Sequence, residues 1–365
     1  MNRRVNVIGV GLRPFFLPSD PRAAAVPASE AVRLALADGG IDYARVEAVY
    51  CASADGRPCA GQAACAPLGL TGIPIFNIEN GGASGASALH LARQAIALGV
   101  ADCVLALGTE AGGSAGQSEV ERGNALFARA ASEYLARHAV RRESLAMIAV
   151  KAREHAAQNP LALFREPLRL EEVLAEAPLF EVLGASQCCR PAMGAAAVVL
   201  CSDAFARKHG LASAVQILAQ AQCSGLAGES ALWATGYDAS VAAARQVYEE
   251  AGIGPEEVDL CELHDATSIG EILLYEALGF CREGDAEKLI EDGDNTYGGN
   301  RVVNPSGGLL GRGHALGASG LAQCAELVWQ LRGVAGDRQV PQARHALQHS
   351  QSLDGAAVVA LYRRD

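Results

Sequence analysis

The chain has 365 residues, half of them hydrophobic, so it is long enough to bury one large core or two packed domains. Its formal net charge of −11 argues against a nucleic-acid-binding protein and against attraction to an anionic membrane surface. No uncharged apolar run reaches the roughly 20 residues of a membrane span, and neither a signal peptide nor a peroxisomal C-terminal signal is recognisable. We therefore expect a cytoplasmic protein that binds neither nucleic acid nor membrane.

The 11 cysteines are an odd number spread along a long chain, which is not the pattern of a disulfide framework. Cys51, Cys59 and Cys65 lack the spacing of zinc ligands, and the adjacent pair Cys188-Cys189 cannot form zinc geometry alone. Most of these thiols are expected to be reduced and buried as small hydrophobic groups. The sequence therefore predicts no metal site.

Short apolar runs alternate with alanine-rich stretches in the first part of the chain. Strands are predicted at residues 5–12, 46–51, 73–78, 103–107 and 195–201, and helices at 30–37 and 83–98. This order is typical of βα units and predicts a buried, mostly parallel sheet.

The alternation weakens between about residues 110 and 185. A charged helix is predicted at 144–158, and Asn159-Pro160 and Glu166-Pro167 break the pattern after it. We interpret residues 111–185 as an inserted loop domain. In α/β architectures such insertions lie beside the ligand crevice.

The alternation then returns in the second half. Strands are predicted at 215–219, 258–263, 346–349 and 356–361, and helices at 241–250, 269–278 and 321–331. The first half therefore comprises residues 1–110 plus 186–208, and the second comprises residues 209–365.

A short repeat connects the two halves. The four residues 82–85 and the four residues 317–320 both read Gly-Ala-Ser-Gly, and each opens a long alanine-rich helix. The equivalent location of the two motifs indicates an internal duplication. Small residues at both helix starts would let the two helices pack closely.

Three segments carry residues suited to chemistry. His264 follows an apolar strand and precedes a helix, which is where α/β folds place active groups. His314 lies in the glycine-dense segment 304–317, where backbone can approach a ligand closely. Residues 77–85 turn sharply from strand to helix and offer free backbone N–H groups.

A lone histidine is more often a packing or surface residue than a catalytic one. Two histidines on glycine-rich turns, at comparable points of a repeat, favour a functional role for His264 and His314. His349, at the end of a late predicted strand, is a weaker third candidate.

These motifs resemble the C-terminal half of sterol-carrier-protein-type thiolases. The resemblance rests on residues 294–299 (Asp-Asn-Thr-Tyr-Gly-Gly), residues 304–308 (Asn-Pro-Ser-Gly-Gly), Gly313-His314 and His264-Asp265. It extends over nearly the whole chain and is densest from about residue 258 to 345. It implies an α/β thiolase fold: five layers, αβαβα, built from two pseudo-repeated halves with an inserted loop domain, usually as a homodimer.

Members of this family make or break carbon–carbon bonds beside a coenzyme A thioester, using a cysteine nucleophile and a second cysteine as acid/base. By the resemblance, the nucleophile position falls on Gly82 and the second cysteine on Ala266, while the C-terminal loop 350–355 contains no cysteine. Both thiols are therefore missing, and both family histidines are retained. Ser84, inside the helix start, is a poor replacement.

The remaining groups suggest non-covalent chemistry. The backbone N–H of Gly82, with an N–H of the loop 350–354, would form an oxyanion hole. His264 would polarise a thioester carbonyl and His314 would act as general base. Substrate contacts are expected from the loop residues Asn304, Ser306, Gly307 and Ser352.

The chain also resembles cysteine-less thiolase-like aldolases that cleave steroid side-chain CoA thioesters together with a small zinc-ribbon and OB-fold partner. Tyrosines are thought to serve as acid/base there, which makes Tyr297 a candidate by position. A loop-packing tyrosine is an equally good interpretation, because ordinary family members carry it as well.

Three hypotheses follow. The first is a non-covalent lyase or aldolase acting on an acyl-CoA, with CoA thioester as substrate and no covalently bound cofactor. The second is a thiolase-type acyltransferase whose missing thiol comes from a partner. The third is a non-catalytic subunit that binds CoA thioesters or supports an active partner. The acyl group is not readable from the sequence.

Overall fold

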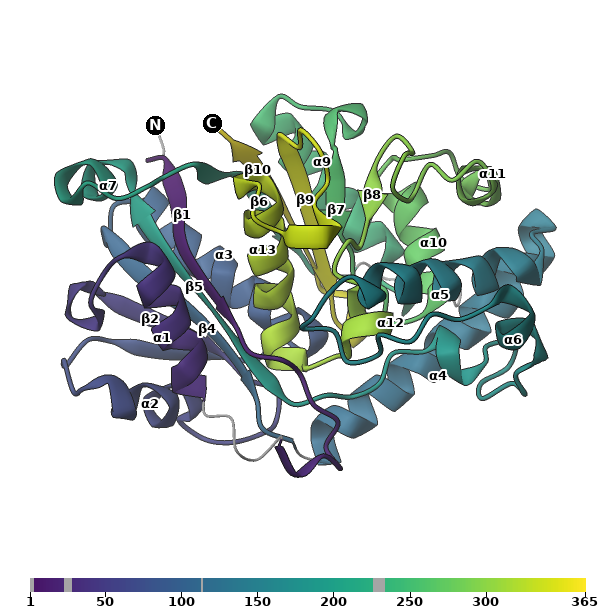
Figure 1. Cartoon of the computed structure of the whole chain (residues 1–365), viewed down its shortest axis with the longest axis horizontal. Coiled ribbons are helices and arrows are strands. Elements are labelled where there is room, and N and C mark those ends of the chain that lie inside the picture. Colours follow the sequence, from purple (N-terminus) through teal and green to yellow (C-terminus); the bar gives the residue numbers. More distant parts are fainter. Residues whose placement is uncertain (1–2, 23–27, 113, 226–233) are drawn as a thin grey trace.

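The computed structural model describes residues 3–22, 28–112, 114–225 and 234–365 (Figure 1). Within these residues, ten strands form one mixed sheet in the order β3-β2-β4-β5-β1-β6-β10-β9-β7-β8. The strands are β1 (Val5–Leu12), β2 (Ala48–Ala52), β3 (Ile75–Ile78), β4 (Cys103–Glu110), β5 (Gly194–Ser202), β6 (Val215–Cys223), β7 (Leu260–Glu262), β8 (Val302–Val303), β9 (His345–Gln351) and β10 (Ala357–Arg364).

The sheet repeats one pairing pattern twice. β2 pairs in parallel with β3 and β4, while β5 pairs antiparallel with β4 and β1. In the second half β7 pairs in parallel with β8 and β9, while β10 pairs antiparallel with β9 and β6. The halves meet where Asn6 of β1 pairs with Gln216 of β6. This order confirms the duplication predicted from the repeated motif.

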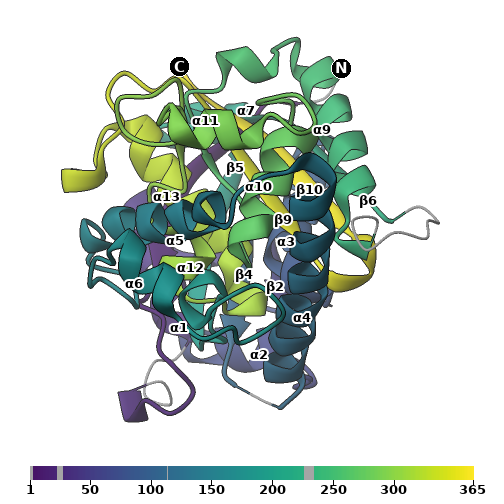
Figure 2. The ribbon, with the colours of Figure 1, turned by 90° about the vertical axis from the view of Figure 1, so that its right-hand side faces the viewer.

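Two central helices lie between the halves of the sheet. The helices are α1 (Ala28–Gly39), α2 (Ala60–Cys65), α3 (Ser84–Ala97), α4 (Ser114–His138), α5 (Arg142–Ala157), α6 (Leu170–Ala175), α7 (Asp203–His209), α9 (Tyr237–Ala251), α10 (Ser268–Ala277), α11 (Ala286–Glu291), α12 (Gly308–Arg312) and α13 (Leu316–Arg332). α13 packs on α3 and touches β4 and β5 of one half and β9 of the other. α1 covers β1 and β5, and α9 covers β6 and β10, which gives the five layers (Figures 1 and 2).

Glycines bring the central helices into backbone contact. A Cβ on Gly320 of α13 would lie 2.4 Å from the backbone nitrogen of Ala86 in α3. A Cβ on Gly85 of α3 would lie 2.9 Å from the carbonyl oxygen of Gly317. Any side chain at these positions would push the helices apart, so the glycines of the repeated motif set their spacing.

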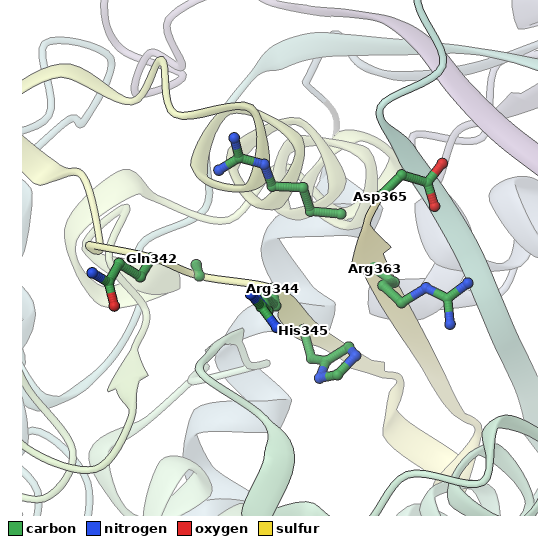
Figure 3. Close-up of a pocket in the computed structure, with 7 residues that line it drawn as sticks. Gln342, Arg344, His345, Arg363 and Asp365 are labelled. Carbon is green, nitrogen blue, oxygen red and sulfur yellow. The ribbon is translucent and has the colours of Figure 1, made fainter.

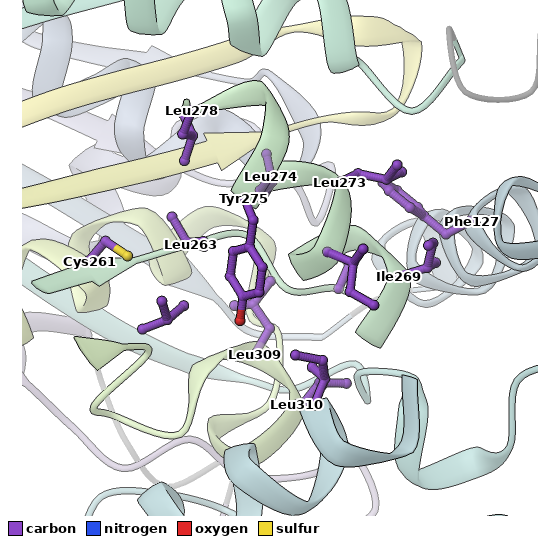
Figure 4. Packing of buried hydrophobic residues seen from close by; sticks show 14 of the residues in the cluster. Phe127, Cys261, Leu263, Ile269, Leu273, Leu274, Tyr275, Leu278, Leu309 and Leu310 are labelled. Atoms are coloured by element: carbon purple, nitrogen blue, oxygen red, sulfur yellow. The ribbon is translucent and has the colours of Figure 1, made fainter. Parts of the chain in front are cut away.

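The segment between β4 and β5 contributes the helices α4, α5 and α6, and it packs on the second half. Phe127 of α4 packs with Ile269 and Leu273 of α10, and Leu310 of α12 closes the same apolar cluster (Figure 4). The ammonium of Lys151 in α5 forms a buried ion pair with Glu271 of α10. The inserted helices are thus anchored where the loops of the second half converge.

Most elements follow the sequence predictions, and three differ. β3 begins at Ile75 rather than at residue 73, because Pro74 has no N–H to donate to a ladder. The 25-residue helix α4 had no counterpart among the predicted elements, and residues 308–312 of the glycine-dense segment form the short helix α12 rather than a loop. No helix in the described residues is both long and apolar enough to span a bilayer.

Candidate active site

Four chain segments meet at one small cavity. They are the 3-10 turn Gly81–Ala83 before α3, the residues after β7, the link between α12 and α13, and the residues around the end of β9. The cavity has a volume of about 30 Å³, which is room for about one water molecule. It is lined by Gly82, Glu119, Val120, Gly123, Phe127, Cys189, His264, Ala266, His314, Leu316, Gln351, Ser352 and Leu353.

Gly82 faces both histidines. A Cβ built on Gly82 would lie 3.2 Å from Nε2 of His314 and 3.0 Å from Cε1 of His264. The same Cβ would lie 2.7 Å from the carbonyl oxygen of Gln351, closer than real Cβ contacts come. Position 82 is thus aimed at the imidazoles, and the backbone after β9 has closed over the space that a side chain would need.

The two imidazoles form a perpendicular pair. The ring centroids of His264 and His314 are 4.9 Å apart, with an interplanar angle of 86°. Nδ1 of His314 lies 3.0 Å from the hydroxyl oxygen of Ser319, one turn into α13, so Nε2 is the nitrogen that faces the cavity. Ser319 belongs to the second copy of the repeated motif, which orients the histidine of the same half.

Burial keeps both imidazoles neutral. It lowers the pKa of His264 to about 3. It also lowers the pKa of His314 well below its usual value, and the nearby His264 adds to the effect. A neutral imidazole carries one N–H donor and one acceptor nitrogen, so each ring can either polarise a carbonyl or accept a proton.

A carboxylate caps the backbone at position 82. The N–H of Gly82 donates a hydrogen bond to Oε1 of Glu119 in α4, with an N–O distance of 3.0 Å. The equivalent glycine of the repeat has the same kind of cap, because the N–H of Gly317 donates to Oε2 of Glu110 over 3.1 Å. The N–H expected to serve an oxyanion hole is therefore engaged by a carboxylate in this structure.

The predicted substrate-contact residues separate into two groups. Ser352 lines the cavity. Asn304 is fully buried behind it, where its Oδ1 accepts from the N–H of Leu263 and its amide donates to Glu271. Ser306 donates its hydroxyl hydrogen to Glu262 over 2.8 Å, and Gly307 packs on Ala156 of α5. Asn304, Ser306 and Gly307 brace the loops that carry the histidines and do not line the cavity.

Tyr297 lies apart from the histidine pair. Its hydroxyl donates to the carbonyl oxygen of Arg338 over 2.7 Å, and its ring contacts the ring of His155 edge-on. Burial raises the pKa of its phenol. The structure therefore gives Tyr297 the contacts of a loop-packing tyrosine.

Two further groups weighed from the sequence are occupied by structural contacts. The hydroxyl of Ser84 donates to the carbonyl oxygen of Gly81 and accepts from the N–H of Asn80, both over 2.7 Å. Nε2 of His349 lies 2.9 Å from the hydroxyl of Ser240, and its buried Nδ1 has no hydrogen-bond partner in the described residues. Burial lowers the pKa of His349 to about 3.

The sequence gave no indication of several cavity residues. Glu119 and Phe127 come from α4, in the region where the apolar pattern weakened. Cys189 contributes a thiol whose pKa burial raises well above its usual value, so it is held protonated. Asp265, next to His264, accepts from the N–H groups of Leu309 and Leu310 and anchors the start of α12 instead of facing the cavity.

A larger cavity of about 980 Å³ lies at the opposite end of β9 and β10 (Figure 3). It is lined by exposed arginines, among them Arg344 and Arg363, and by His345 and Asp365. The histidine pair is about 20 Å away along β9, from the rise of about 3.3 Å per strand residue. No cluster of three potential metal ligands occurs among the described residues.

Comparison with protein families agrees with this architecture. Residues 23–120 match the thiolase N-terminal domain, and residues 228–361 match the thiolase C-terminal domain-like family. Among solved structures, the one titled "Ltp2-ChsH2(DUF35) aldolase" has a TM-score of 0.85 at 24% identity and covers 99% of this chain and 98% of that chain. Human mitochondrial 3-ketoacyl-CoA thiolase has a TM-score of 0.79 at 17% identity, with 99% of each chain covered. These two likenesses establish the fold.

Sequence relatives are closer. Benzoylsuccinyl-CoA thiolase subunit BbsB of Thauera aromatica is 38% identical over 320 residues, covering 83% of each chain. Sterol carrier protein 2 of Rattus norvegicus is 44% identical over 392 residues, covering 99% of this chain and 72% of that protein. The chain therefore belongs to the thiolase superfamily, in the branch that contains the thiolase-type sterol carrier proteins.

Proposed function

We propose that the protein acts on an acyl-CoA thioester and breaks or forms a carbon–carbon bond without a covalent acyl-enzyme. One observation carries the proposal: position 82 points at two neutral imidazoles, 3.0 and 3.2 Å from its Cβ direction, and presents no nucleophile there. Ser84 is engaged by backbone and Cys189 is a buried thiol, so neither replaces a thiolate.

An aldol-type reaction fits these groups. In the cleavage direction His314 accepts the proton of a β-hydroxyl group through Nε2. The Cα–Cβ bond breaks as the β-carbon becomes a carbonyl, and its electron pair moves into the thioester as an enolate. An N–H of His264 donates to the enolate oxygen, and protonation at Cα releases the shortened acyl-CoA.

The lining favours an apolar acyl group. Val120, Phe127, Leu316 and Leu353 surround the histidines, and Ala266 leaves space beside His264. A cavity of about 30 Å³ does not hold an acyl chain, so the loops must move when substrate binds. The CoA thioester is substrate in this proposal, and no cofactor is required.

Two other functions remain as outcomes of the test. A thiolase-type acyltransferase needs a thiol, and the relative from Thauera is named as one subunit of a thiolase, which favours completion by a partner chain. A non-catalytic subunit would bind CoA thioesters without turnover. We further propose a homodimer, and a small zinc-ribbon partner because a solved structure of this fold is titled as a complex with a DUF35 component.

The test uses 3-hydroxybutyryl-CoA, which retro-aldol cleavage would convert to acetaldehyde and acetyl-CoA. We expect both products from the purified chain, alone or co-expressed with a DUF35-type partner, and an unchanged intact protein mass during turnover. His314→Gln should lower the rate roughly 10²–10⁴-fold, the usual contribution of a positioned proton acceptor. His209→Gln, outside the cavity, is the matched control.

The outcomes separate the three functions. A mass increase of one acyl group would show covalent transfer and would exclude the non-covalent mechanism. Binding of acetyl-CoA without turnover, together with full activity of a partner complex carrying His314→Gln, would identify a non-catalytic subunit.

A further inference from the structure

A carboxylate reaches the catalytic cavity from the inserted helices. Glu119 is half-buried in α4, and its Oε1 accepts the hydrogen bond from the N–H of Gly82. A Cβ on Gly81, whose φ is +50°, would lie only 2.3 Å from the same Oε1. The two consecutive glycines therefore form a seat for the carboxylate at the start of α3, and a side chain at position 81 would displace it.

Glu119 differs from the other ionisable groups of the cavity. Those are the imidazoles of His264 and His314 and the thiol of Cys189, and burial favours the uncharged form of each. Among the described residues that line the cavity, Glu119 supplies the one carboxylate. It is also a long, partly exposed side chain held by one printed hydrogen bond, so it can swing when the cavity opens.

The proposed reaction requires proton transfer at two atoms. One proton belongs to the β-hydroxyl group, and His314 is placed for it. The other belongs to Cα of the acyl group, and an imidazole whose protonated form is disfavoured by burial is a weak base for so weakly acidic a C–H bond. A carboxylate is the base that the cavity offers for this second proton.

We propose that Glu119 is the acid–base residue that serves Cα of the acyl-CoA. In the bond-forming direction its carboxylate takes a proton from Cα, and the C–H electron pair moves into the thioester to form the enolate held by His264. In the cleavage direction the protonated carboxyl returns that proton to Cα. As Glu119 turns toward Cα, it releases the N–H of Gly82 to the substrate oxygen. This inference rests on the proposed function.

A structural cap is the competing explanation, and the chain contains one for comparison. Glu110 caps Gly317 in the same way, but it is 4% exposed and does not line the cavity. If Glu119 were only a cap, a glutamine in its place would suffice, because the amide oxygen accepts the same hydrogen bond.

The experiment measures exchange of the Cα hydrogens of acetyl-CoA in D₂O by mass spectrometry, which needs no aldehyde partner. We expect wild-type protein to exchange them and Glu119→Gln to do so roughly 100-fold more slowly or worse, given the usual 10²–10⁴-fold contribution of a general base. The dissociation constant for acetyl-CoA should change less than threefold. Glu121→Gln, an exposed position on the same helix, is the matched control and should exchange like wild type.

Glu119→Asp retains a carboxylate and should keep measurable exchange, which separates lost chemistry from lost folding. The acidic limb of the rate–pH profile should be present in wild type and absent in Glu119→Gln. Exchange by Glu119→Gln within threefold of wild type would overturn the assignment and leave the proposed function standing. No exchange by wild-type protein above the spontaneous rate would overturn the proposed function itself, and this assignment with it.

Discussion

Restoring a thiol at position 82 is the most direct probe of the residue-scale geometry. In Gly82→Cys the new Cβ would lie 3.2 Å from Nε2 of His314, close enough for the histidine to activate the sulfur. We expect acetyl-CoA to add one acetyl group to this variant and none to wild type, measured by intact mass. The 2.7 Å approach to the carbonyl oxygen of Gln351 should lower the free energy of unfolding by about 1–3 kcal/mol.

Gly82→Ala is the control for this experiment, because it has the same Cβ clash and no nucleophile. It should lose similar stability and stay unmodified. An unmodified Gly82→Cys protein that folds and binds acetyl-CoA would contradict the inferred geometry.

The buried histidines link stability to pH at the same scale. Burial lowers the pKa of His349 to about 3 in the folded protein, whereas an unfolded histidine titrates near 6.5. Below about pH 6.5 the unfolded chain binds the extra proton, so this residue reduces stability as pH falls and has little effect above pH 7. The loss between pH 7 and pH 5 is about 2 kcal/mol.

His349→Gln should therefore gain about 2 kcal/mol relative to wild type between pH 7 and pH 5, measured by urea denaturation at both pH values. Comparison with wild type is necessary because burial raises the pKa values of Glu110 and Glu262 to about 7, and such groups stabilise the fold in the opposite direction as pH falls. Parallel curves for the two proteins would show that His349 titrates normally in the folded state.

Sequence reasoning located His264, His314 and Gly82 because strand ends and glycine turns mark places where backbone meets ligand. It could not locate Glu119, since the contact with Gly82 spans 37 residues and depends on how α4 packs. It also placed Tyr297 near the chemistry from motif position alone. The hydroxyl's hydrogen bond to Arg338 is a tertiary contact that no local pattern reveals.

At the scale of elements, the contact between α3 and α13 determines where the active-site loops lie. Gly320→Ala would place a Cβ 2.4 Å from the backbone nitrogen of Ala86, and backbone cannot move aside cheaply. We expect a loss of about 1–3 kcal/mol or more in the free energy of unfolding, measured by denaturant titration. Gly39→Ala, whose nearest atoms would lie at 3.5 Å, is the control and should be close to neutral.

Strands and helices with strong periodicity were predicted to within a few residues, as for β1 at Val5–Leu12. α4 was missed because its apolar positions, such as Val120 and Phe127, face the cavity and α10 rather than the sheet, so they give no simple stripe. α12 was missed because glycines at residues 308 and 311 disfavour a helix. A Cβ at Gly308 would lie 2.1 Å from Oδ2 of Asp265, so tertiary packing requires glycine there. The division into two halves and a loop domain stays a prediction.

At the scale of the whole molecule, β3 is an edge strand of the described sheet. Phe76 on this strand is 48% exposed and stacks on Tyr50 of β2, with ring centroids 5.1 Å apart. An exposed apolar edge pairs readily with another strand, so we expect a dimer of the 37.7 kDa chain joined there. Phe76→Lys should shift the mass measured by light scattering toward the monomer.

Leu98→Lys is the control for the dimer, because Leu98 is 70% exposed at the end of α3 rather than on the edge strand. It should leave the mass unchanged. A wild-type protein that is monomeric at micromolar concentration would contradict the proposed homodimer.

The paired caps on Gly82 and Gly317 suggest how the duplicated halves came to differ. A side chain at Gly317 would strike the carbonyl oxygens of Thr109 and Ala52 at 2.5 and 2.9 Å, so the architecture itself forbids change there. A side chain at Gly82 would meet two imidazoles and one carbonyl at the rim of a cavity. One copy of the motif thus stays fixed as scaffold, while the other is free to gain or lose a reactive group during evolution without dismantling the fold.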